Sequence, residues 1–186
     1  MSTQPTPEEL FEAIKARDAG RVKTLLDQGA DPNAKVDVSG RLMPMLHQAL
    51  TYDEWDNSGT CELTRLLVEK GANIEMTDDY FDRTPLMHAA YGQGYTLKYL
   101  IEKGAVLDKK DREGRTALNH TLISRGTENT VTKNILEAAL RLAEEKAKEK
   151  TVQEAEQKKF AALHNTAKKR QDALNKLRPK MTVRPS

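Results

Sequence analysis

The sequence of 186 residues is poor in several of the features that mark common protein classes. Cys61 is its only cysteine, so no disulfide can form within the chain, and a reducing, cytoplasmic location fits. No run of about 18 apolar residues occurs, which predicts no membrane-spanning helix and no membrane partner. The first residues, MSTQPTPEEL, lack both the basic flank and the apolar core of a signal peptide, so we expect none.

Motifs that would indicate catalysis or cofactor binding are also lacking. No spacing of Cys and His suits zinc, and the chain contains neither a Gly-rich phosphate loop nor a Gly-x-Ser-x-Gly elbow. We therefore predict no catalytic residue, no cofactor, no metal site and no enzymatic activity. An enzyme is kept only as the third of three functional hypotheses.

An internal repeat is present. The dipeptide Gly-Ala recurs three times, each time shortly after a leucine-rich pair or triplet such as Leu25-Leu26 or Leu100-Ile101. The three occurrences are Gly29-Ala30-Asp31, Gly71-Ala72-Asn73 and Gly104-Ala105-Val106. A glycine directly after the last residue of a helix favours a left-handed C-cap. The three glycines are spaced by 42 and 33 residues. The pattern therefore predicts several similar helical units in succession.

The unit from Thr84 to Asp108 shows the pattern best. Thr84 can cap a first helix and Pro85 suits its first turn, while Gly92 separates it from a second helix. The second helix has an apolar face at helical spacing, made of Leu97, Leu100 and Ile101. Two helices this short cannot bury their apolar faces alone, so the unit needs neighbouring copies.

Residues 84–90, TPLMHAA, resemble the T-P-L-H-x-A-A motif of the ankyrin repeat, and a period of about 33 residues with two helices and a turn is typical of that family. The resemblance covers roughly Leu10 to Leu142. It implies an all-α, ankyrin-like helical-repeat solenoid of about four repeats, the first an atypical cap, with a long C-terminal helix. The division we predict is a flexible lead-in (1–7), the ankyrin-repeat domain (8–142), a charged helical extension (143–178) and a loose tail (179–186).

Two departures from the family pattern fall in the second unit. In the first turn, residues 29–43, Gly40 precedes His47 by seven residues where the family has five, which predicts a longer turn. Residues 52–60 form an insertion between the two helices of this unit, and it contains Trp55, the only tryptophan. We leave open whether Trp55 covers the insertion or contacts a partner.

The histidines and the cysteine have structural explanations in the family. The resemblance implies that His47 bonds the backbone between repeats, whereas His88 and His120 are displaced by one residue and are expected at partly exposed helix positions. The turn residues Asn33 and Asn73 are expected to hydrogen-bond the turns. Cys61, at a helix start, is either a half-buried thiol or one with a lowered pKa.

With no catalytic site in view, the predicted function is non-catalytic protein–protein interaction, as an adaptor or as an inhibitor of the immunity type. The resemblance implies a concave groove formed by turn tips and first helices. Tyr95 and Tyr99 are expected between helices instead. The partner-binding residues predicted for the groove are Val38, Arg41, Tyr52, Trp55, Tyr80, Phe81, Arg83, Tyr91, Arg112, Glu113 and Arg115.

The C-terminal stretch has neither Gly nor Pro from Val131 until Pro179 and predicts one helix over 131–177. Ile135, Ala139 and Leu142 are expected to pack on the third repeat, and Thr151 with Glu154 allows a break. Residues 141–186 hold 13 basic and 6 acidic residues. The predicted basic tail site consists of Lys168, Lys169, Arg170, Lys176 and Arg178.

Three interpretations of this tail stay open. It is a solvated helix, or a helix that pairs with another helix as in a coiled coil, or a basic segment that binds nucleic acid or another polyanion. The helix-pairing interpretation rests on apolar residues at three-four spacing: Phe160, Leu163, Ala167, Leu174 and Leu177. Because Phe160 is the only aromatic residue of the tail, a stacking platform for single strands is not expected.

Overall fold

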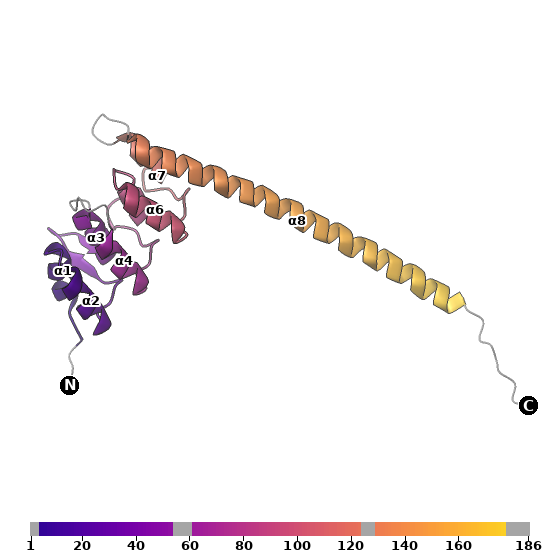
Figure 1. The fold of residues 1–186 in the computed structure, drawn as a ribbon, viewed down its shortest axis with the longest axis horizontal. Helices are drawn as coiled ribbons and strands as arrows, with labels where there is room; N and C mark the ends of the chain where they lie inside the picture. Colours follow the sequence, from indigo (N-terminus) through magenta and orange to yellow (C-terminus); the bar gives the residue numbers. More distant parts are fainter. Residues whose placement is uncertain (1–3, 54–60, 124–128, 178–186) are drawn as a thin grey trace, which may run out of the picture. The chain divides into compact units, whose positions relative to one another are not determined.

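The structure is a computed structural model that describes residues 4–53, 61–123 and 129–177 (Figure 1). The chain divides into two compact units, Met1–Leu140 and Arg141–Ser186. The first unit holds the repeats, and the second consists of the greater part of one helix. The two units are described separately below.

The first unit consists of short helices in pairs, joined by extended turns. The first two pairs and the hairpin between them are α1 (Pro7–Lys15), α2 (Ala19–Asp27), β1 (Lys35–Asp37), β2 (Leu42–Pro44), α3 (Met45–Asp53) and α4 (Glu62–Glu69). The later elements are α5 (Pro85–Ala89), α6 (Gly94–Glu102), α7 (Ala117–Ile123) and α8 (Thr130–Leu177). This architecture confirms the predicted all-α repeat fold.

Local chemistry explains where the helices begin and end. Thr6 caps α1 through a capping box with Glu9, and the Thr84 hydroxyl accepts a hydrogen bond from the Met87 N–H at the start of α5. At the helix ends, Gly29, Gly71 and Gly104 have φ of 95°, 93° and 90°. A left-handed backbone of this kind costs glycine least, which is why the same residue closes three repeats.

The long first turn is a β-hairpin. Strands β1 and β2 pair antiparallel, with Val36 opposite Met43. At its tip the Val38 N–H donates to the Arg41 carbonyl over 2.8 Å, and Ser39 and Gly40 both have positive φ. This is the backbone of a two-residue type I′ turn, which suits the twist of paired strands. The extra length expected from the sequence is therefore used to pair two short strands.

The core of the repeat unit has two clusters of buried apolar side chains. The first gathers residues of α1–α4, among them Leu10, Leu46 and Leu67. The second includes Leu50 of α3 together with Leu100, which is fully buried. The prediction that Leu100 is a core residue is confirmed.

The junction between α3 and α4 contains a cap that the sequence analysis missed. Asp53, the last residue of α3, is buried, and its carboxylate oxygens accept hydrogen bonds from the N–H groups of Leu63 and Thr64 over 3.1 and 2.8 Å. An acidic side chain at a helix start satisfies N–H groups that have no partner within the helix. Trp55 lies outside the described residues.

Helix α8 is continuous from Thr130 to Leu177. The Thr151 hydroxyl donates to the Lys148 carbonyl inside the helix, so it does not start a second one. In the repeat unit, Leu136 is fully buried and Ile135 packs against the second core cluster. The expectation for Leu142 is wrong, because it belongs to the second unit and is 52% exposed. No helix within the described ranges is both long and apolar enough to cross a membrane.

Candidate protein-binding face

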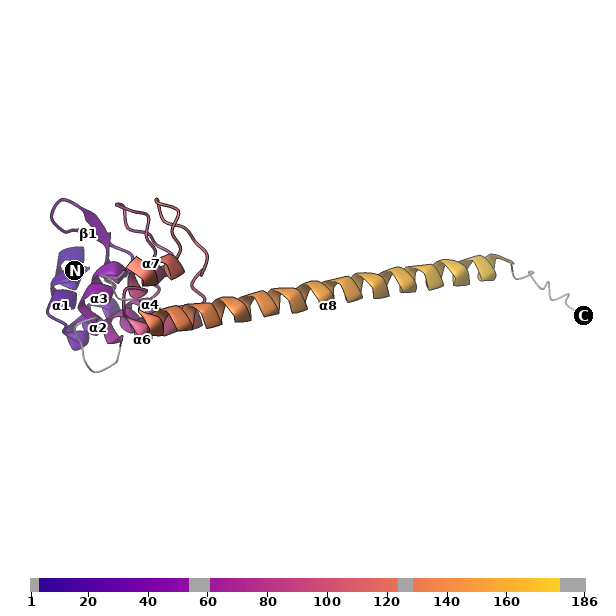
Figure 2. The ribbon, with the colours of Figure 1, turned by 90° about the horizontal axis from the view of Figure 1, so that it is seen from above.

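The turns project from one side of the repeat helices, next to one another (Figure 2). Hydrogen bonds join the first turn to the second. The Asn33 amide donates to the Gly71 carbonyl over 3.1 Å, and the Asn33 side-chain oxygen accepts from the Asn73 N–H over 2.7 Å. Asn73 also bonds within its own turn, because its side-chain oxygen accepts from the Glu75 N–H. The hydrogen-bonding roles expected for Asn33 and Asn73 are confirmed.

Contacts at the tips extend this linkage across all three turns. Lys35 of β1 pairs with Asp79 of the second turn at 2.6 Å. Arg112 of the third turn donates from its backbone N–H to the Phe81 carbonyl, and its guanidinium donates to the Tyr80 carbonyl and to Asp82. The tips are therefore fixed relative to each other before any partner binds.

Five of the predicted partner-binding residues form one group, which we call the aromatic–arginine cluster: Arg41, Tyr80, Phe81, Arg83 and Tyr91. The Arg41 guanidinium lies 4.2 Å from the centre of the Tyr80 ring, and the Tyr80 and Phe81 rings meet edge to face at 4.1 Å. On the other side, the Arg83 guanidinium lies 4.1 Å from the Phe81 ring and 5.9 Å from the Tyr91 ring. The two cations thus each lie against at least one ring across the tips, at distances typical of cation–π contacts.

The cluster reaches the surface mainly through Tyr80, which is 47% exposed, and Arg41, which is also exposed. Phe81, Arg83 and Tyr91 are half-buried beneath them. Beside Tyr80, between the hairpin and the second turn, lies a hollow of about 310 Å³ lined by Gly40, Arg41, Leu42, Met43, Asp79 and Tyr80. The surface therefore offers a ring, a cation and a hollow in one place.

The other predicted site residues lie in varied surroundings. Val38 and Tyr52 are half-buried and pack against the first core cluster. Arg112 and Glu113 are exposed at the third turn, and Arg115 is half-buried against Asp111 and Glu113. The structure thus brings together the residues around Tyr80 but not the whole predicted set.

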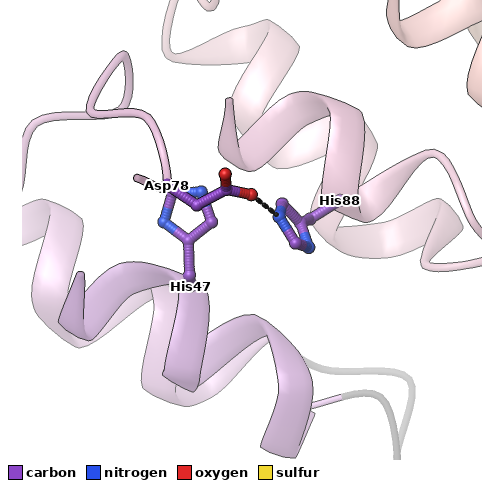
Figure 3. Close-up of side chains that lie close together, drawn as sticks. All are labelled: His47, Asp78 and His88. Atoms are coloured by element: carbon purple, nitrogen blue, oxygen red, sulfur yellow. Dashed lines mark hydrogen bonds and ion pairs between the residues drawn. The ribbon is translucent and has the colours of Figure 1, made fainter. Parts of the chain in front are cut away.

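Beneath the tips lie two aspartate–histidine pairs that the sequence analysis did not predict. In the second turn, Asp78 accepts hydrogen bonds from the Tyr80 and Phe81 N–H groups, and its other oxygen lies 3.0 Å from His88 Nε2 (Figure 3). These hydrogen bonds outweigh the effect of burial and hold the pKa of Asp78 below its ordinary value. The pair therefore ties the turn to the following helix α5.

The third turn repeats this arrangement one unit later. Asp111 accepts from the Glu113 and Arg115 N–H groups and lies 2.9 Å from His120 Nε2. His120 is fully buried, and its Nδ1 is 2.8 Å from the Tyr91 hydroxyl. The expected partial exposure of His120 is wrong, because Asp111 draws the ring inward. The spacing of an aspartate nine or ten residues before a histidine, in two successive units, is the signal that could have revealed both pairs.

His47 fills the position that the resemblance assigned to it. It is buried, and its Nε2 is 3.0 Å from the Arg83 carbonyl of the next repeat. Because a carbonyl only accepts, Nε2 carries the proton. Burial lowers the pKa of His47 to about 3, so the ring is neutral near pH 7. The expected backbone bond between repeats is confirmed.

His47, Asp78 and His88 bring possible metal-ligand atoms within 4.8 Å of one another. Figure 3 shows the Asp78 carboxylate directed at His88, with the His47 ring beside it. Two of the candidate nitrogens already make hydrogen bonds, since His47 Nε2 donates to the Arg83 carbonyl and His88 Nε2 pairs with Asp78, whereas the buried His47 Nδ1 has no hydrogen-bond partner in the described structure. A zinc ion would need these nitrogens and oxygens at about 2.0–2.2 Å instead. The observed contacts are those of a hydrogen-bonded turn, and the predicted absence of a metal site stays a prediction.

Cys61 precedes α4 and is buried. Burial, followed by the charge of Asp53, raises the pKa of its thiol. The alternative of a lowered pKa is therefore wrong, and a neutral thiol of this kind is a weak nucleophile. The expectation that Tyr95 packs between helices is also wrong, because Tyr95 is 70% exposed, while Tyr99 is half-buried.

In the second unit, the described side chains from Arg141 to Ala173 are all exposed. They include Lys168, Lys169 and Arg170 of the predicted basic tail, together with Phe160 at 75% and Leu163 at 63% exposure. Lys176 lies within α8, and Arg178 is outside the described residues.

Comparison with known proteins supports the repeats directly. A family model of ankyrin repeats in three copies matches residues 46–147, more than half of the sequence. The chain belongs to the ankyrin-repeat family. Repeats of this family generally mediate protein–protein interaction. The match begins in α3, so α1 and α2 lie outside it, as an atypical first repeat would.

Individual relatives are far longer than this ankyrin-repeat chain. It is 37% identical over 111 residues to a transient receptor potential cation channel subfamily A member 1 homolog of Caenorhabditis elegans, covering 59% of the chain and 8% of that protein. It is 32% identical over 117 residues to ankyrin repeat and SAM domain-containing protein 6 of Rattus norvegicus, covering 62% of the chain and 12% of that protein. The similarity to each relative thus concerns a small part of its length.

Proposed function

We propose that this ankyrin-repeat protein binds another protein through the aromatic–arginine cluster and the adjacent turn tips, as an adaptor or inhibitor without catalysis of its own. The observation that carries the proposal is the exposed Tyr80 ring, held between Arg41 and Phe81 beside a hollow. Tyr and Arg are among the residues that most often dominate binding energy at interfaces. A cytoplasmic location belongs to the same proposal.

The cross-linked turns support this proposal energetically. Association requires that side chains and loops at an interface become ordered, and that ordering opposes binding. Here Lys35, Asn33 and Arg112 already connect neighbouring turns. The tips therefore lose little further freedom when a partner docks.

The test compares capture of a partner from native lysate by the full-length chain and by variants. Tyr80→Ser with Phe81→Ser is expected to weaken binding about tenfold or more while the thermal unfolding midpoint changes little, because both rings lie at the turn tip. Tyr95→Ser is the matched control, since it removes an aromatic ring that is 70% exposed on α6, outside the cluster. Equal binding by the double variant and the wild type would contradict the proposal.

A second candidate function rests on the exposed side chains of the second unit. Lys168, Lys169 and Arg170 offer positive charge for nucleic acid or another polyanion, and Phe160 with Leu163 offers an apolar edge to a partner helix. Replacing the three basic residues with Gln is expected to abolish salt-sensitive binding of a polyanion such as RNA. Unchanged RNA binding by that variant would rule out the polyanion function of this tail.

A further inference from the structure

The arginines of the turn tips differ in whether they donate hydrogen bonds to an acidic side chain. Arg112 donates to both oxygens of Asp82, and Arg115 pairs with Asp111. Arg41 and Arg83 lie against aromatic rings instead. Within the described part of the chain, neither donates a hydrogen bond to an acidic side chain, and Arg83 Nε is 3.9 Å from the nearer Asp111 oxygen, beyond hydrogen-bonding distance.

Arg83 is largely buried, which makes the missing hydrogen-bond acceptor important for its stability. Its side chain is only 17% exposed, and its Nε is buried without a hydrogen-bond partner in the described structure. Asp111 balances part of its charge from 3.9 Å, but a buried N–H group without an acceptor still carries a cost until an acceptor arrives. The rings of Phe81 and Tyr91 hold the guanidinium in place, so a carboxylate could bind it without first ordering the side chain.

Arg41 lies on the other side of the same two rings. It contacts Tyr80, which contacts Phe81, which contacts Arg83, through successive distances of 4.2, 4.1 and 4.1 Å. The hollow of about 310 Å³ is lined by Arg41 and Tyr80 among others. Two guanidinium groups that donate no hydrogen bond to an acidic side chain of the described structure, and a hollow for an apolar side chain, thus lie within one short stretch of surface.

The charge of the whole face indicates which anion fits. The three turns, residues 29–44, 71–83 and 104–115, hold seven basic and nine acidic residues. A face without excess positive charge does not attract a continuous phosphate backbone, which binds by its overall field. The acidic excess opposes a carboxylate as well, so a carboxylate is bound only where a guanidinium donates to it directly, at Arg41 and Arg83.

We propose that the partner presents an acidic segment with an apolar residue, its carboxylates bound by Arg41 and Arg83 and its apolar side chain in the hollow beside Tyr80. This inference rests on the proposed function, because it names the chemistry of the partner at the same face. Charge-assisted hydrogen bonds from a fixed guanidinium favour the bidentate geometry of a carboxylate.

The experiment selects peptides from a displayed library of random sequences against the full-length chain. The expected result is enrichment of Asp or Glu near a Leu-like residue. The best peptide is then synthesised with its acids and with Asn or Gln in their place, and each version is titrated by fluorescence anisotropy. We expect the amide version to bind about tenfold or more weakly.

Variants of the chain identify the arginines. Arg41→Gln changes an exposed residue and is expected to weaken binding of the acidic peptide but not of its amide version. Arg41→Gln combined with Arg83→Gln is expected to weaken binding of the acidic peptide further. Arg21→Gln with Arg65→Gln is the control, because it removes two exposed arginines from α2 and α4. Thermal unfolding of each variant checks that the fold is retained.

The outcomes separate this inference from the proposed function. The inference would be overturned, and the proposed function kept, if the selected peptides need Tyr80 and Phe81 for binding but are not enriched in acidic residues. The same conclusion would follow if these peptides bind the Arg41→Gln variant as tightly as the wild type. If no selected peptide loses affinity on replacement of Tyr80 and Phe81 with Ser, both are overturned.

Discussion

The repeat unit and the C-terminal helix show two ways in which one chain reaches a defined secondary structure. In the repeat unit, helices such as α5, with five residues, persist because their apolar faces are buried and their turns are hydrogen-bonded to neighbours. Helix α8 runs for 48 residues, and its described side chains from Arg141 to Ala173 are all exposed. Short helices depend on packing, whereas a long one can rely on the helix propensity of Ala, Glu, Lys and Gln.

The most severe way to test this comparison is to remove a core side chain. Leu100→Ala is expected to lower the free energy of unfolding by roughly 2–5 kcal/mol, because Leu100 is fully buried in the second core cluster. Chemical denaturation measures the loss. Leu163→Ala is the matched control in α8, since that side chain is 63% exposed, and we expect no comparable change. If both variants lost the same free energy of unfolding, the repeat unit and α8 would depend on side-chain packing to the same degree.

The next test removes a polar contact from the repeat unit. Asp111→Ala is expected to destabilise the chain by about 3 kcal/mol, because the buried His120 and two turn N–H groups lose their acceptor. Asp108→Ala, at an exposed position of the same turn, provides the comparison. A similar unfolding midpoint for both variants would argue against a structural role for the aspartate–histidine pair.

A change of pH affects the buried histidines of the repeats. The ordinary pKa of histidine is 6.5, and burial lowers that of His47 to about 3. Between these values the unfolded chain takes up a proton that the folded chain does not, so stability falls as pH falls. From pH 6.5 to pH 5 the loss from His47 is about 2 kcal/mol.

His120, whose pKa burial also lowers, acts in the same direction. The lowered pKa values of Asp78 and Asp111 affect stability only below their ordinary value of 3.8. Urea denaturation at pH 7 and pH 5 measures the slope, which His47→Gln is expected to reduce. A slope in His47→Gln equal to that of the wild type would refute this assignment.

The smallest expected effect concerns α8 alone. Ala155→Gly is expected to cost about 1 kcal/mol of local helix stability, because glycine has more freedom to lose in a helix than alanine. Circular dichroism at increasing temperature should show less helix, while the main unfolding transition of the repeats stays in place. A lower midpoint for the repeats would mean that the part of α8 beyond Leu140 also contributes to their stability.

The sequence was most informative where one residue determines the local backbone. Thr84 at a helix start and Gly104 at a helix stop predicted α5 and the end of α6 correctly, because caps act through neighbouring residues. The continuous α8 also followed from composition. The partner-binding role of the turn tips stays a prediction, although the aromatic–arginine cluster brings five of the predicted residues together.

The wrong predictions concern the exposure of side chains that depends on contacts with other parts of the chain. The pairing of Asp111 with His120 depends on how a turn folds back on the next helix, and its spacing stands out only when two successive units are compared. On α6, Tyr95 is exposed while Thr96 is buried, because adjacent helical positions point about 100° apart. A repeat pattern fixes which helices exist, but an error of one position is enough to reverse the exposure of a side chain.

Helix α3 has a place in the core that limits how the protein can be divided. It contributes Leu46 and Ala49 to the first core cluster and Leu50 to the second. A fragment that ends before α3 would expose the side chains of the first core cluster that pack against this helix, and a fragment that begins after it would expose those of the second. The repeats therefore cannot be split there into two halves that fold independently, and a protease that cuts within α3 would release two unstable pieces.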